Sequence, residues 1–153
     1  MALTDRSQPG SVAPGLGQAG ILAVGDTLAF LIFAAIGRAS HGEAAGLAAI
    51  LQIAGTAAPF AAGWFAVAPF SGVFRNAIAY QPRRALARTA LAWSIACPIG
   101  LGLRALIRQT GIPITFAIIT YLTNLVLLLG WRGALAWLRT RRPPGRPDEL
   151  PDV

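Results

Sequence analysis

The chain has 153 residues, of which 55% are hydrophobic and only 12% are charged, and its formal net charge is +7. A soluble domain carries about 25% charged residues, so this composition argues against a soluble domain and indicates an integral membrane protein. A single cysteine and a single histidine exclude an internal disulfide and cannot build a zinc site within the chain. They also exclude haem held by two histidines of one chain.

Every basic residue is an arginine, and the arginines border the apolar runs instead of covering one face. A basic chain can indicate nucleic-acid binding, but this placement is typical of membrane orientation. We therefore expect the lipid bilayer as partner, with anionic lipid headgroups near the arginine-rich cytoplasmic loops, and no nucleic acid.

The first predicted span covers residues 20–37 and follows residues 1–19, whose Gly, Pro, Ser and Gln content predicts a disordered tail. The span contains one carboxylate, Asp26. A charge at the centre of a span costs about 2.5–3.5 kcal/mol on insertion scales, so it is usually paired or functional. A polar turn, RASHGE, follows at residues 38–43.

The second predicted span, residues 44–70, has no charge and exceeds the ~20 residues that a bilayer needs. It should tilt or kink, and Pro59 is the expected kink because it lacks the N–H that a helix requires. Small side chains recur every four residues along one helical face, which would let another helix approach closely. They are Ala54, Ala58, Ala62 and Ala66.

The third predicted span, residues 85–103, is the least hydrophobic run, and it follows a predicted loop at residues 71–87. Fifteen uncharged residues separate Arg88 from Arg104, about 22 Å at 1.5 Å per residue. The bilayer core is about 30 Å thick, so both arginines should lie at its edges. Pro98 should bend this helix.

The fourth predicted span, residues 112–131, is uncharged and ends at Trp131 and Arg132, which we interpret as an anchor at the membrane interface. The transmembrane domain then covers residues 20–138. The proline-rich, charged residues 139–153 are predicted to form a disordered tail.

Four spans predict an all-α polytopic membrane protein, one four-helix bundle with both termini on the same side. Ten arginines fall on the side of the termini and three on the other. The positive-inside rule therefore predicts cytoplasmic termini, and we expect the chain in the plasma membrane. The ten are Arg6, Arg75, Arg83, Arg84, Arg88, Arg132, Arg139, Arg141, Arg142 and Arg146, and the three are Arg38, Arg104 and Arg108.

Residue counting places Asp26 and Arg88 at similar depth, on spans that run in the same direction, so we predict an ion pair between them. Polar residues of all four spans would share that layer. It is either structural, fixing the register of the helices through hydrogen bonds, or a site for an ion, proton or small polar ligand, open to the cytoplasm. The predicted layer comprises Asp26, Thr27, Thr56, Arg88, Thr89 and Asn124.

A second candidate site lies at the outer surface, where the turn after the first span faces the end of the third. His41 with Glu43 would respond to protons, and the arginines would hold lipid phosphate. A solvated turn with no ligand is the alternative. The cluster comprises Arg38, Ser40, His41, Glu43, Arg104 and Arg108.

The chain has no phosphate-binding glycine loop and no HExxH, GxSxG or haem-attachment motif. We therefore expect neither enzymatic activity nor a cofactor. Two functional hypotheses remain. One is a small transporter or permeation component. We expect it to be oligomeric, because four short helices enclose little lumen. A cavity beside Asp26 would favour this hypothesis. The other is an accessory or scaffold subunit of a larger membrane complex, which an exposed alanine face would favour.

Several motifs resemble the prokaryotic membrane proteins of domain-of-unknown-function family 3054. They are Gly25-Asp26 in the first span, the RASHGE turn, Pro98 with Arg104, and Gly130-Trp131-Arg132. The resemblance covers residues 20–132 and implies a four-span integral membrane protein. The family has no assigned activity, so the resemblance implies no catalytic residue.

Overall fold

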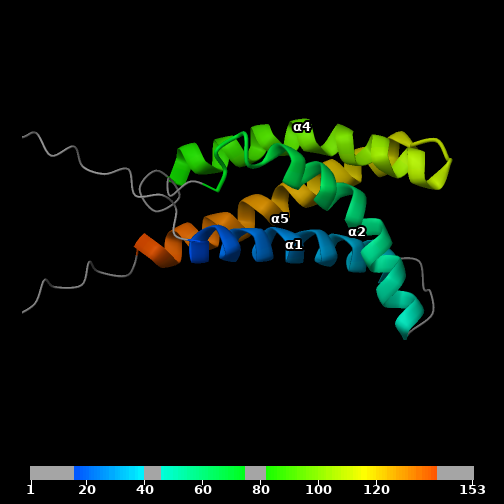
Figure 1. The fold of residues 1–153 in the computed structure, drawn as a ribbon, viewed down its shortest axis with the longest axis horizontal. Helices are drawn as coiled ribbons and strands as arrows, with labels where there is room; N and C mark the ends of the chain where they lie inside the picture. The colour runs from blue at the N-terminus through cyan, green and yellow to red at the C-terminus, as the bar shows by residue number, and fades with distance from the viewer. Residues whose placement is uncertain (1–15, 40–45, 75–81, 141–153) are drawn as a thin grey trace, which may run out of the picture.

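The structure, a computed structural model, describes residues 16–39, 46–74 and 82–140. The described chain is all-α (Figure 1), as the sequence predicts. Each of its helices is long and apolar enough to cross a membrane. They are α1 (Leu16–Ala39), α2 (Leu47–Val67), α4 (Pro82–Arg108) and α5 (Ile114–Thr140).

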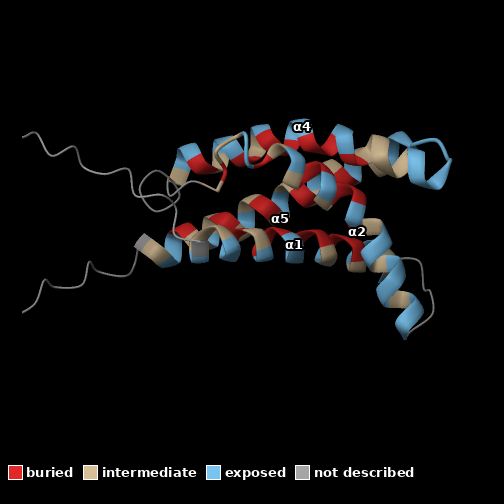
Figure 2. Cartoon of the chain, viewed as in Figure 1, coloured by how far each residue is buried: buried red, intermediate tan, exposed pale blue. Residues whose placement is uncertain are grey.

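Each helix packs against two others, in the order α1, α2, α4, α5 and back to α1. The core between them is aromatic, with Phe30, Phe60, Trp64 and Trp93 fully buried. Figure 2 shows the buried residues on the inward faces of the helices, while exposed residues cover the outward faces. Many of the exposed side chains are large and apolar, as expected of helices that face lipid instead of water.

Helix α2 begins after Gly46, whose φ of 98° is one that glycine adopts readily. It contains Pro59 and changes direction along its length (Figure 1), and its N-terminal part extends away from the other helices. The C-terminal part crosses α4 closely. A Cβ added to Gly63 would lie 2.7 Å from the Ala96 carbonyl oxygen, and one added to Gly100 would lie 3.0 Å from the Phe60 Cα.

The alanine face of α2 points away from the protein core. All four of its residues are exposed, and Gly55 on the same helix also faces open space. The buried side of the helix is formed instead by Ala57, Phe60 and Trp64. The predicted stripe of small residues therefore lies on the outer surface of the chain.

Helix α4 begins earlier than expected. The sequence predicted a loop through residue 87, but the helix starts at Pro82. Proline is well suited to a first helical position, because its missing N–H would have no partner there and its φ is already helical. Residues 68–74 continue α2 as a turn, with a backbone hydrogen bond from the Val73 N–H to the Ala68 carbonyl.

Candidate functional site

The carboxylate of Asp26 is fully buried and forms an ion pair with Arg132, where α1 packs on α5. Arg132 Nε donates to Oδ1 at 3.0 Å, and Nη2 donates to Oδ2 at 2.5 Å. Arg132 is itself only 1% exposed. This two-point contact is the strongest arrangement available to a guanidinium and a carboxylate, so the two charges neutralise each other inside the protein.

Other segments complete the hydrogen bonding of this pair. Trp64 Nε1 on α2 donates to Asp26 Oδ2 at 3.0 Å, and Arg132 Nη1 donates to the Val73 carbonyl at 3.1 Å. The guanidinium also lies over the rings of Trp64 and Phe74, at 5.5 and 5.7 Å from their centroids. The pair thus connects α1, α2, α5 and the turn after α2.

The predicted ion pair between Asp26 and Arg88 is wrong. Arg88 is exposed, and α1 packs on α2 and α5 but not on α4, which carries Arg88. Residue counting predicts how deep each charge lies, but it does not predict which helices are neighbours. The prediction that Arg132 anchors the chain at the membrane interface is wrong for a related reason, since its side chain turns inward to Asp26.

The remaining members of the predicted polar layer do not meet at Asp26. Thr27 is exposed and donates to the Ala23 carbonyl, while Thr89 is buried and donates to the Ala85 carbonyl. Asn124 Nδ2 donates to the Thr120 carbonyl. These groups satisfy the backbone of their own helices. Thr56 lies apart from them, in a pocket at the other end of the helices.

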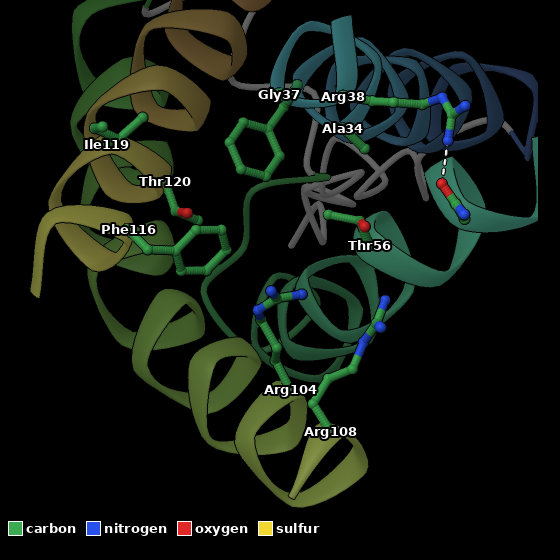
Figure 3. A pocket seen from close by; sticks show the side chains of 11 residues that line it. Ala34, Gly37, Arg38, Thr56, Arg104, Arg108, Phe116, Ile119 and Thr120 are labelled. Atoms are coloured by element: carbon green, nitrogen blue, oxygen red, sulfur yellow. Dashed lines mark hydrogen bonds between the residues drawn. The ribbon is translucent and has the colours of Figure 1, made fainter. Parts of the chain in front are cut away.

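That pocket, which we call the arginine pocket, has a volume of about 500 Å³ and is open to the surface. Figure 3 shows Arg104 and Arg108 extending into it from α4, while Arg38 of α1 turns toward α2. There Arg38 Nη1 donates to Gln52 Oε1. The lining residues are Phe33, Ala34, Gly37, Arg38, Gln52, Thr56, Arg104, Arg108, Phe116, Ile119 and Thr120.

The arginine pocket brings together three residues of the predicted outer cluster, namely Arg38, Arg104 and Arg108. Ser40, His41 and Glu43 of that cluster lie outside the described residues. The sequence interpretation did not place Gln52, Phe116 or Thr120 at this site. The four-residue spacing of Phe116 and Thr120 would have put them on one face of the fourth span, but nothing in the sequence says which way that face points.

In the described part of the chain, no carboxylate is left to pair with Arg104 and Arg108 of the arginine pocket. Within residues 16–39, 46–74 and 82–140 the one acidic side chain is Asp26, and it is committed to Arg132. Arg104 lies over the ring of Phe116, 4.4 Å from its centroid, which leaves its N–H edge available. In the same described ranges no group of three His, Cys, Asp or Glu side chains could hold a metal ion.

The membrane-length helices and the buried charge pair define a four-helix integral membrane protein. Comparison with protein families matches residues 23–135 to the protein of unknown function family DUF3054, and the chain belongs to this family. No curated protein and no solved structure matches the chain.

Two of the motifs that carry the family resemblance meet in the structure. Gly25-Asp26 on α1 faces Trp131-Arg132 on α5, because Arg132 pairs with Asp26 while the Trp131 ring covers Gly25. A Cβ added to Gly25 would overlap the Trp131 indole, 2.1 Å from Cε2. The two dipeptides thus form one contact between the first and last helices.

Proposed function

We propose that the protein is a small, non-enzymatic membrane protein that binds an anion in the arginine pocket, as a permeation or transport component. The observation that carries the proposal is the approach of Arg38, Arg104 and Arg108 to one open cavity. Guanidinium groups recognise phosphate and carboxylate through paired N–H donors. An anion would also relieve the repulsion between like charges held close together on α4.

The buried charge pair is a weaker candidate for this role. Asp26 is fully buried, its carboxylate already accepts hydrogen bonds from Arg132 and Trp64, and it does not line the arginine pocket. A solute would have to displace Arg132 to reach it. The arginine pocket requires no such displacement, because it is open and the side chains of Arg104 and Arg108 extend into it.

We further propose that the helices form one transmembrane bundle with both termini in the cytoplasm of a prokaryotic cell. Arg132 is buried with Asp26, so it no longer counts as a flanking charge. Nine arginines then remain on the side of the termini against three on the other, and the positive-inside rule still favours this orientation. The arginine pocket would then open at the outer surface of the plasma membrane.

Thermal unfolding in a nonionic detergent tests anion binding. At constant ionic strength, replacing chloride by inorganic phosphate at about ten times its Kd should raise the Tm by roughly 3–5 °C. Exchanging Arg104 and Arg108 together for Gln should remove this increase, since the pocket loses two of its three cationic groups.

Arg88→Gln serves as the control, because it removes an exposed arginine of the same helix outside the pocket, and it should keep the full phosphate effect. If the double variant responded to phosphate like the wild type, the proposal would be wrong.

A second candidate function, an accessory subunit of a larger complex or a homo-oligomer, is favoured by the exposed alanine face of α2. Small side chains let another helix approach closely in lipid, where backbone contact and packing drive association. Ala58→Leu with Ala62→Leu should then shift the protein to a smaller species in detergent-corrected light scattering. Leu122→Ala on the exposed side of α5 is the control and should leave the mass unchanged.

A further inference from the structure

The hydroxyl group of Thr120 is buried without a hydrogen-bond partner. Its side chain is 0% exposed, and Oγ1 has no hydrogen-bond partner among the described residues. Hydroxyl groups in helices often donate to the carbonyl four residues earlier, as Thr27, Thr89 and Ser94 do in this protein. Leaving a buried polar group unsatisfied is costly. Asn124 Oδ1 and Trp131 Nε1 share this state with Thr120 Oγ1 in the described residues, but of the three residues only Thr120 lines the arginine pocket.

Thr120 lines the arginine pocket. Figure 3 shows its oxygen turned toward the cavity, across from Thr56. Thr120 lies six residues after the start of α5, about 9 Å into the helix. Arg108 ends α4, and Arg104 is one turn inside it, about 6 Å. The pocket therefore offers charged donors near its mouth and a neutral donor deeper in the membrane.

The wall between these two levels is apolar. Phe33 and Phe116 lie on it, the latter beneath the Arg104 guanidinium. Ile119 lines the pocket beside Thr120 and is 54% exposed, so the deeper part of the pocket borders the lipid-facing surface. A free phosphate ion would satisfy the arginines but would leave this wall and the Thr120 hydroxyl without a contact.

We propose that the arginine pocket binds a glycerophospholipid. Its phosphate contacts Arg104 and Arg108, an ester carbonyl accepts a hydrogen bond from Thr120 Oγ1, and the acyl chains leave past Ile119. In a phospholipid the ester carbonyls lie deeper in the membrane than the phosphate. The donors of the pocket have the same order, because the arginines lie near its mouth and Thr120 lies deeper. The inference rests on the proposed anion binding and specifies its ligand class, and free phosphate is the alternative source of the same chemistry.

Native mass spectrometry of the full-length protein in detergent tests the assignment. The ligands are dioleoyl phosphatidylglycerol, its diether analogue, which lacks the ester carbonyls, and inorganic phosphate. The wild type should bind the diester about fivefold more tightly than the diether, the effect of one hydrogen bond. Thr120→Val should remove this difference, because valine has the shape of threonine without the donor, while Thr120→Ser should retain it.

The matched control is Thr27→Val, which removes an exposed hydroxyl on α1 outside the pocket and should preserve the fivefold preference. Circular dichroism and gel-filtration profiles verify that each variant is folded. Equal binding of diester and diether by the wild type, or an undiminished preference in Thr120→Val, would overturn the lipid assignment. Anion binding would still stand if the exchange of Arg104 and Arg108 for Gln abolished the phosphate response. If that exchange left the phosphate response intact, both anion binding and the lipid assignment would be wrong.

Discussion

At the scale of single residues, the pairing of Asp26 with Arg132 explains how a carboxylate is accommodated inside a membrane-length helix. The carboxylate accepts three hydrogen bonds from Arg132 and Trp64, and the remaining guanidinium edge donates to the Val73 carbonyl. A buried pair of this kind is not by itself a large source of stability, but breaking it leaves an uncompensated charge. Its two members should therefore be sensitive to replacement.

We expect Asp26→Asn and Arg132→Gln each to lower the free energy of unfolding by about 3–5 kcal/mol, the usual cost of an unpaired buried charge. The double variant should recover part of this loss, because neither charge remains. Arg88→Gln should leave stability unchanged. Unfolding of the purified proteins in mixed detergent micelles measures all four. The observed pairing would be contradicted if Arg88→Gln lowered the free energy of unfolding as much as Asp26→Asn does while Arg132→Gln left it unchanged.

At the scale of elements, the crossing of α2 and α4 depends on glycines that face each other. Gly63 lies against the Ala96 carbonyl and the Gly100 backbone, and Gly100 lies against Phe60. Close backbone approach of this kind is the usual way that membrane helices gain packing energy, since lipid supplies no hydrophobic drive between them. The same contact buries Pro59 and Phe60, which places the bent region of α2 against α4.

Gly100→Ala should therefore lower the free energy of unfolding by about 1–3 kcal/mol, the usual effect of overpacking a dense core. Gly102, two residues further along α4, has open space where its Cβ would lie. Gly102→Ala should be neutral or stabilising by up to about 1 kcal/mol, because alanine is the better helix former. Chemical unfolding followed by circular dichroism compares the two. Equal effects would mean that the crossing is looser than the structure shows.

At the scale of the whole molecule, two groups of charged side chains in the described residues have different surroundings. One is the neutralised pair of Asp26 and Arg132, which joins α1 to α5. The other is the arginine pocket, at the end of the helices where α1 finishes and α5 begins. The first makes the contact between the first and last helices specific, whereas the second leaves charged donors available. This division is why we assign ligand binding to the pocket and a structural role to the pair.

The proposed orientation predicts which side of the membrane each segment faces. Single cysteines introduced at Ser7 and Asp152 should react with a membrane-impermeant maleimide only after the cells are opened. One introduced at Gln109, in the turn between α4 and α5, should react in intact cells. The wild-type chain is the control, because its one cysteine, Cys97, is buried. Labelling of Asp152→Cys in intact cells would refute the orientation.

The number and order of the helices follow from the sequence alone, because the lengths of the apolar runs and the charges between them determine which segments can cross a bilayer. The grouping of Arg38, Arg104 and Arg108 at one end follows in the same way, since it needs only the position of each residue near a helix end. Such inferences depend on distance along a helix axis, which residue counting provides.

The partner of Asp26 and the direction of the alanine face were decided by the tertiary structure. Both depend on which helices are neighbours and how each is rotated about its axis. The sequence analysis predicts Arg88 as the partner and places Arg132 at the membrane interface, whereas the packing of α1 against α5 instead of α4 selects Arg132. The sequence specifies how far along its helix a side chain lies, but the packing of the helices specifies what that side chain contacts.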